Sequence, residues 1–407
     1  MRGNILKKIT FCLITFILIA GSFSLSAQAA ISGNFDFKLN LGAGAGSSPD
    51  FFYGAEAYAN LRLKIPAGEY AAFYGAFNLI AAAGSSPLAI STGSIADFLG
   101  LSAVSIEENY VAAMELERLY VQFSGDSFGL NAGLFRIPFG YSPVWGPMDF
   151  LNPRNPIESD ARYRGVLGLT ASYFPEKLPD MKLLVFAVVP KNPFTLNGGG
   201  ARFGLSWDNH WRKASLQLLY CYECPASYVD PFSLLPDEKY PLGLHRAGLS
   251  VKAEVEIGLT AELFYTINPD SFAGIDGLAA SAGIDYSFFD GKLYLLAEYL
   301  YSGSKSTGAK SAAEPFGHTG AHYLYAAGIW KMNDFSSLTF GCIANLGDVS
   351  FTAIASWQYE LFQGTALTLR TNVPFDKDSF KAGPPGELGP KKSGNYAYFT
   401  TGVKVKF

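Results

Sequence analysis

The chain has 407 residues, with 31 basic and 35 acidic side chains and a net charge of −4. Charged residues make up 16 % of the chain and aromatic residues 15 %, and there are 43 glycines. This apolar, aromatic composition excludes an intrinsically disordered chain, which needs low hydrophobicity and high net charge. The acidic balance provides no basic surface for nucleic acid.

Residues 1–29 have the three parts of a secretory signal peptide. Arg2, Lys7 and Lys8 form a positive start, residues 9–20 are an apolar run, and Ala27-Gln28-Ala29 is a small-x-small cleavage site. The apolar run is shorter than the ~20 residues of a membrane-spanning helix. No later segment is long and apolar enough for one either. We therefore expect an exported chain, residues 30–407, without a transmembrane helix.

Apolar and polar residues alternate along the segments that follow, which predicts strands with one apolar and one polar face. In residues 31–43 the odd positions are mostly apolar and the even positions are polar. The last segment places Phe407 on its apolar face, which resembles the terminal aromatic residue of bacterial outer-membrane barrels. The alternation recurs in residues 55–65, 247–255, 278–288, 351–360 and 397–407.

The connections between these strands are short and long in turn, with one of the short turns predicted at residues 208–213. This asymmetry is typical of a bacterial β-barrel with short periplasmic turns and long outer loops. The sequence predicts an all-β fold, one closed antiparallel transmembrane barrel of about 18 strands. A count of 16 fits nearly as well, because the segments near 181–190, 201–207 and 259–267 alternate weakly. A secreted soluble sandwich or β-helix is the alternative, but it does not account for long apolar faces together with so few charges.

A barrel of 16 to 18 strands leaves an aqueous channel unless something fills it. The connection at 138–161 is the third outer loop by our count, and prolines, aromatic residues and charges of both signs crowd it. We expect it to fold inward and narrow the channel, or else to form an exposed lid held by its own arginine–carboxylate pairs. The candidate residues at the narrow point are Arg136, Asp149, Arg154, Glu158, Asp160, Arg162 and Arg164 near or within the loop, facing Arg62, Arg118 and Arg370 on the wall.

The same region resembles bacterial porin-like barrels of the alginate-export and related porin type. The resemblance rests on a Gly-x-x-x-Ile-x-x-Gly element, here Gly133, Ile137 and Gly140, which leads into an Asn-Pro-rich loop. It covers about fifty residues, and elsewhere only the general barrel pattern is shared. It implies an 18-stranded diffusion channel, but the mixed charges expected inside this barrel do not match the strongly basic channel that alginate would need.

The sequence does not predict an enzyme, because no serine elbow or paired-aspartate motif accompanies the histidines. No cofactor is expected. His318 and His322 could hold a metal only with a third ligand, which the sequence does not supply, so no metal is expected. Cys221-Tyr-Glu-Cys224 forms either a local disulfide, which an oxidising compartment favours, or two free thiols, or a metal or redox site.

Together these patterns predict an outer-membrane channel of a diderm bacterium for passive diffusion of small hydrophilic solutes. The alternative is a non-conducting surface barrel, an adhesin or a structural protein, which would have a closed interior. The expected partners are outer-membrane lipid and small hydrophilic solutes or ions, with no nucleic acid. A homotrimer, as in many general porins, is left open because no subunit interface can be identified in the sequence.

Overall fold

The computed structural model describes residues 29–43, 51–84, 103–107, 110–152, 165–189, 200–224, 243–269, 277–303, 320–376, 388 and 397–407. Residues 1–28 of the predicted signal peptide therefore lie outside the described residues. So do residues 153–161 of the predicted third loop and the region around His318. In the part of the chain that is described, no helix is long and apolar enough to cross a membrane.

The strands form where the sequence alternates, since a two-residue period places every second side chain on the same face of a sheet. The three weakly alternating segments form strands as well, β8, β9 and β12. The strands are β1 (Ala30–Ala43), β2 (Phe51–Pro66), β3 (Ala71–Gly84), β4 (Ala103–Glu107), β5 (Tyr110–Ser124), β6 (Phe128–Phe135), β7 (Val166–Tyr173), β8 (Met181–Val188), β9 (Arg202–Trp211), β10 (Ala214–Glu223), β11 (Leu244–Glu254), β12 (Gly258–Ile267), β13 (Leu278–Phe288), β14 (Leu293–Ser302), β15 (His322–Asn333), β16 (Ser336–Asn345), β17 (Ser350–Phe362), β18 (Thr365–Asp376) and β19 (Ala397–Lys406).

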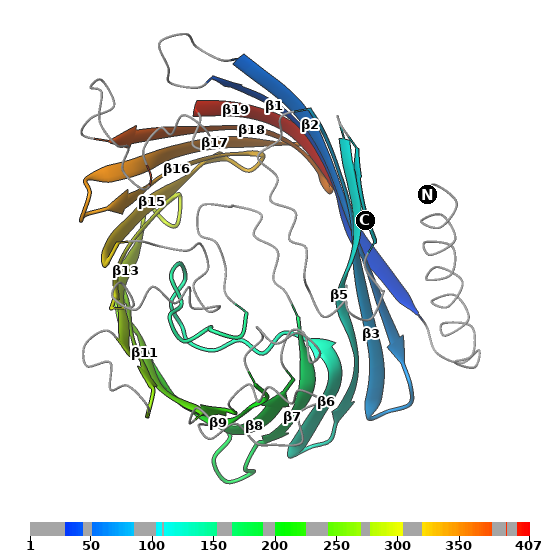
Figure 1. Cartoon of the computed structure of the whole chain (residues 1–407), viewed down its shortest axis with the longest axis vertical. Helices are drawn as coiled ribbons and strands as arrows, with labels where there is room; N and C mark the ends of the chain where they lie inside the picture. The colour runs from blue at the N-terminus through cyan, green and yellow to red at the C-terminus, as the bar shows by residue number, and fades with distance from the viewer. Residues whose placement is uncertain are drawn as a thin grey trace, which may run out of the picture.

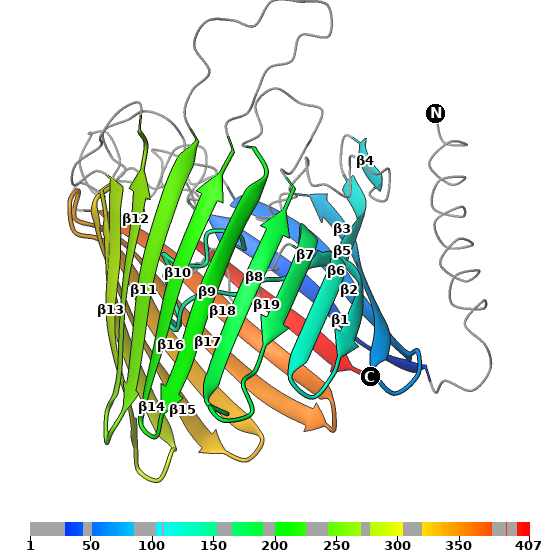
Figure 2. The same cartoon turned by 90° about the horizontal axis from the view of Figure 1, so that it is seen from below.

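The sheet closes on itself because β1 pairs antiparallel with β19, from Asn34 opposite Lys406 to Ala43 opposite Ala397. β3 pairs directly with β5, whereas β4 pairs with the first residues of β5 at the rim of the barrel (Figure 2). The remaining 18 strands form the closed antiparallel ring seen in Figure 1. This confirms the predicted fold class and the higher of the two strand counts.

The two faces of the barrel have opposite chemistry. Large apolar side chains are exposed on the outside, for example Leu39, Val185 and Leu263, while polar side chains such as Asn60 and Ser250 are buried on the inside. An apolar exterior and a polar interior are expected when a sheet faces lipid outside and polar groups inside. The barrel is in this sense inverted relative to a water-soluble domain.

The connections differ in length at the two ends of the barrel. One end, here the short-turn end, has tight turns with left-handed residues such as Gly68, Gly291 and Gly364, at φ values of 94°, 81° and 79°. The other end, here the long-connection end, joins β6 to β7 and β10 to β11. One expectation differs: the turn predicted at residues 208–213 is shorter, because β9 continues to Trp211 and only two residues separate it from β10.

Gly133 in β6 occupies a position that only glycine tolerates. Its φ is 128°, and a Cβ there would overlap the carbonyl oxygen of Leu119 on the neighbouring strand. We expect Gly133→Ala to destabilise the barrel by on the order of 1–3 kcal/mol, because strained backbone adds to the overlap. The temperature at which the folded band disappears from a heat-modifiable gel should fall. Gly129→Ala on the same strand is the control, since its Cβ would have only ordinary contacts at 3.8 Å or more, and its transition should stay at the wild-type temperature.

Candidate functional site

Residues 136–152, here called the inward segment, leave β6 and run through the interior of the barrel (Figure 1). Their backbone is bound by side chains that point inward from the wall. The N–H of Gly140 donates to Gln217 Oε1 on β10 at 2.5 Å, and the N–H of Tyr141 donates to Ser250 Oγ on β11 at 3.0 Å. Side chains of the wall strands therefore hold the segment through its main chain. This attachment does not depend on most of the segment's own side chains.

Glu262 on β12 is the first of two carboxylates that fix the segment. Its Oε1 accepts the N–H of Ser142 at 2.7 Å and its Oε2 accepts the N–H of Met148 at 3.3 Å. Gly140 lies so close that a Cβ would overlap this carboxylate, and its φ of 82° is left-handed. The second glycine of the Gly-x-x-x-Ile-x-x-Gly element is therefore required by the close approach of the segment to Glu262.

Glu298 on β14 is the second carboxylate. It accepts the N–H groups of Val144 and Trp145, both at 3.1 Å, and the hydroxyl of Ser142. The indole N–H of Trp145 also donates to the backbone oxygen of Glu298 at 3.1 Å. Charge-assisted hydrogen bonds of this kind are stronger than neutral ones. Because Glu298 is almost fully buried, these donors neutralise much of the cost of placing its charge away from water.

The inward segment is also closed by bonds within itself. Arg136 Nη2 lies 2.9 Å from Asp149 Oδ2, and the N–H of Ile137 donates to Asn152 Oδ1 at 2.9 Å. Burial raises the pKa of Asp149 to about 6, although the Arg136 guanidinium opposes that shift. Two of the charged residues that the sequence predicts at the narrow point are therefore paired with each other and mostly buried.

Apolar side chains pack between the inward segment and the wall. Phe139 contacts Phe186 of β8 with ring centroids 5.3 Å apart, and Phe150 stacks on Phe264 of β12 at 5.2 Å. Arg246 of β11 lies over the ring of Phe150 at 5.3 Å. The interior is thus not uniformly polar as expected, because the wall carries an apolar cluster where the segment covers it. That cluster consists of Phe135, Ile137, Phe139, Met148, Phe150, Leu151, Val166, Leu184, Phe186, Val188, Leu219, Cys221 and Phe264.

A second apolar cluster joins the inward segment to Leu388, from the connection between β18 and β19. The amide of Leu388 donates to Ser350 Oγ at 2.9 Å, and its carbonyl accepts from Thr352 Oγ1 at 3.2 Å. Leu388 shares this cluster with Trp145 of the segment, whose ring lies 5.7 Å from that of Tyr323 on β15. Two connections that are far apart in the chain therefore meet in the interior.

Two of the predicted wall arginines, Arg62 on β2 and Arg118 on β5, lie in one row of the sheet, both opposite Ala76 of β3. The Nε of Arg62 donates to Asn60 Oδ1 at 2.6 Å, and Arg118 pairs with Glu117 at 3.2 Å. The register of β3 and β5 shifts at this point, and such a bulge re-aims side chains. Glu117 is buried, whereas Arg62 is exposed. The exposed charge that this row presents to the interior is therefore mainly positive.

The third wall arginine, Arg370 on β18, donates from Nε to Asn372 Oδ1 at 3.0 Å. It is half-buried and lies on the same side of the ring as Arg62 and Arg118, because β18 and β2 are separated by β19 and β1. The structure thus gathers the wall candidates on one side. The remaining loop candidates lie outside the described residues: Arg154, Glu158, Asp160, Arg162 and Arg164.

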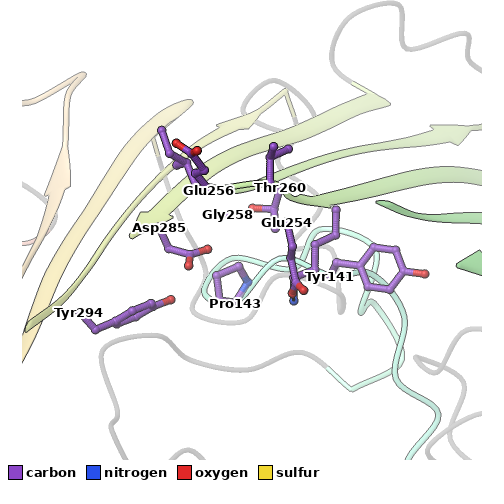
Figure 3. Close-up of a pocket in the computed structure, with 11 residues that line it drawn as sticks. Tyr141, Pro143, Glu254, Glu256, Gly258, Thr260, Asp285 and Tyr294 are labelled. Atoms are coloured by element: carbon purple, nitrogen blue, oxygen red, sulfur yellow. Dashed lines mark ion pairs between the residues drawn. The ribbon is translucent and has the colours of Figure 1, made fainter. Parts of the chain in front are cut away.

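An acidic pocket of about 250 Å³ lies on the other side of the ring, beneath the inward segment at the short-turn end (Figure 3). Glu254 forms an ion pair with Lys252 yet stays largely exposed, and Asp285 borders the same space. Its strands, β11 to β14, lie about half a circuit from β2. The lining residues are Tyr141, Pro143, Lys252, Glu254, Val255, Glu256, Ile257, Gly258, Thr260, Asp285 and Tyr294.

The structure answers part of what the sequence left open about the cysteines and histidines. Cys221 is fully buried against the inward segment, and it and Cys224 are both free thiols, so the disulfide alternative is not realised. His322 Nδ1 lies 2.6 Å from the hydroxyl of Tyr299. Within the described ranges, no three metal-ligating side chains come together.

The residues that position the segment were not singled out from the sequence as such. Alternation indicates only that Glu262 and Glu298 lie on the polar face of their strands, because it places a residue on a face without identifying its partner. The available signal was Gly140, since a glycine in a proline-rich loop indicates a close approach of the backbone to another group.

Comparisons with known proteins support the fold and nothing finer. No protein-family model and no curated protein matches the chain. Among solved structures, Acinetobacter baumannii OccAB3 has a TM-score of 0.51 at 9 % identity, covering 93 % of this chain and 99 % of that one. A triple mutant of Rhodopseudomonas blastica porin has a TM-score of 0.46 at 11 % identity, covering 93 % and 100 %. The chain thus shares a porin-like β-barrel fold with OccAB3.

Proposed function

We propose that the protein is a bacterial outer-membrane channel for passive diffusion of small hydrophilic solutes, narrowed by the inward segment. The observation that carries the proposal is the binding of the segment's backbone by Glu262 and Glu298 inside an 18-stranded barrel. A barrel of this size has room for an aqueous channel. A segment bound along one side reduces its cross-section without having to close it.

Exposed charges of opposite sign lie on opposite sides of the interior. Exposed Arg62 and Lys64 face inward from β2, while Glu254 and Asp285 border the pocket about half a circuit away. Opposite charges across a narrow, poorly screened space create a transverse field. Such a field orients ions and dipolar solutes and so selects among them by charge as well as size.

The test is the single-channel conductance of the purified, refolded protein in a planar bilayer, with the reversal potential measured under a salt gradient. We expect steady openings and a salt-dependent current. A silent bilayer, from protein shown to be folded by its heat-modifiable mobility, would contradict the proposal. It would instead support the non-conducting surface barrel, with Leu388 and the inward segment together filling the interior.

A further inference from the structure

Two histidines on the outer face of the barrel have the same unusual surroundings. His245 is the second residue of β11 and His322 is the first of β15, and both strands begin at the long-connection end. Each lies opposite a tyrosine of the preceding strand, Tyr222 for His245 and Tyr301 for His322. The two hairpins are separated by β12 and β13, so the arrangement occurs twice on one surface.

In both places a second tyrosine fixes the imidazole. The hydroxyl of Tyr220 lies 2.7 Å from His245 Nδ1, and that of Tyr299 lies 2.6 Å from His322 Nδ1. The opposite tyrosine flanks the ring, with centroids 5.0 Å apart at His245 and 5.4 Å at His322. Each imidazole therefore lies between two tyrosine rings. A histidine and the tyrosine whose hydroxyl bonds its Nδ1 are here called a His–Tyr pair.

The hydrogen bond to Nδ1 decides what the other ring nitrogen can do. A phenol that donates to Nδ1 makes Nδ1 the acceptor of a neutral imidazole, and the ring proton is then on Nε2. Nε2–H is thus a donor held at a set orientation.

The location determines which acceptors are available. Leu218 and Val251, on the same outward faces but nearer the middle of the barrel, are exposed as lipid-facing residues are. Tyrosines gather where the apolar belt meets the headgroup layer. In a membrane the abundant acceptor at that level is the phosphate group of lipid headgroups, which takes charge-assisted hydrogen bonds.

We propose that the His245–Tyr220 and His322–Tyr299 pairs bind phosphate oxygens of lipid headgroups in the leaflet at the long-connection end. The inference rests on the proposed function only in that the barrel spans a membrane. It assigns a lipid contact to two sites on the outer face, away from the channel interior.

The test uses the full refolded chain in nanodiscs, with native mass spectrometry to measure retention of phosphatidic acid against phosphatidylcholine. The variant His245→Phe with His322→Phe keeps the ring volume and removes Nε2–H. We expect its preference for phosphatidic acid to fall by about tenfold, the loss typical of a hydrogen bond to a charged acceptor. Tyr220→Phe with Tyr299→Phe, which frees the imidazole to rotate, should give a smaller loss.

His210→Phe is the matched control, because His210 points to the interior and its Nδ1 is bound to Ser215. It should keep the wild-type preference. An unchanged preference in the double histidine variant, or an equal loss in the His210 variant, would overturn the proposal. Displacement of phosphatidic acid by millimolar inorganic phosphate would also overturn it, since the pairs would then bind phosphate from any source.

Conductance separates this inference from the proposed function. The His245 and His322 variant should conduct like the wild type, since both side chains lie on the outer face. A channel that never opens would remove the proposed function and leave the lipid preference measurable.

Discussion

Glu298→Ala is expected to raise single-channel conductance roughly twofold or more, because the channel cross-section grows when the inward segment leaves the wall. The variant removes the acceptor of two main-chain N–H groups, from Val144 and Trp145, and of the Ser142 hydroxyl. Each buried donor left without a partner costs about 1–3 kcal/mol. The segment regains hydrogen bonds for these donors by moving toward water. Planar-bilayer recordings of the refolded variant measure the result.

Glu56→Ala is the control for this experiment. Glu56 is also buried in the interior, but it accepts from Asn40 on the side of the ring away from the segment. Its conductance should remain within the wild-type range. A Glu298 variant that is folded, by heat-modifiable mobility, and still conducts like the wild type would show that the segment does not limit the current.

The double variant Arg62→Gln with Arg370→Gln neutralises two wall arginines. We expect it to raise the ratio of cation to anion permeability roughly twofold or more. Arg62 is exposed to the interior and Arg370 is half-buried on the same side of the ring, so both contribute to the positive side of the transverse field. The shift should shrink as salt rises toward 1 M, where the screening length falls to about 3 Å. Reversal potentials under a salt gradient measure both effects.

Two further double variants sharpen this prediction. Lys177→Gln with Lys213→Gln removes the same charge from exposed short turns, so the permeability ratio should not change. Glu254→Gln with Asp285→Asn removes charge from the acidic pocket, so the ratio should move toward anions. If the turn lysines shifted the ratio as much as the arginines, net charge rather than the two-sided interior would govern selectivity.

Alternation was enough to predict the barrel, even in its weak strands. β8, β9 and β12 formed although their patterns were poor, because a closed barrel leaves no edge unpaired. β8 and β9 pair with each other and with β7 and β10, and β12 pairs with β11 and β13. The turn at residues 208–213 was placed correctly but was too long, since polar Asp208 and His210 continue β9 as inward-facing residues.

The inner face was harder to predict, because alternation assigns a side and not a partner. Leu184 and Phe186 of β8 occupy inward positions although they are apolar, and the inward segment packs on them. Arg136 and Asp149 were expected to oppose other charges across the channel, yet they pair with each other. Arginine–carboxylate pairs within the loop were expected only for an exposed lid, whereas this pair forms in a segment that runs through the interior.

The sequence by itself determined the inverted two-faced barrel and the position of its connections, because a two-residue period and glycine-rich turns are local properties. The resemblance to porin-like barrels also pointed to Gly133 and Gly140, and both have a positive φ in the structure, which glycine adopts without strain. Only the tertiary structure decided which close approaches require these glycines and which charged side chains remain exposed. Glu262 and Glu298 come within reach of Ser142 only after the strands from β6 to β14 have paired and curved around the interior, which no local pattern encodes.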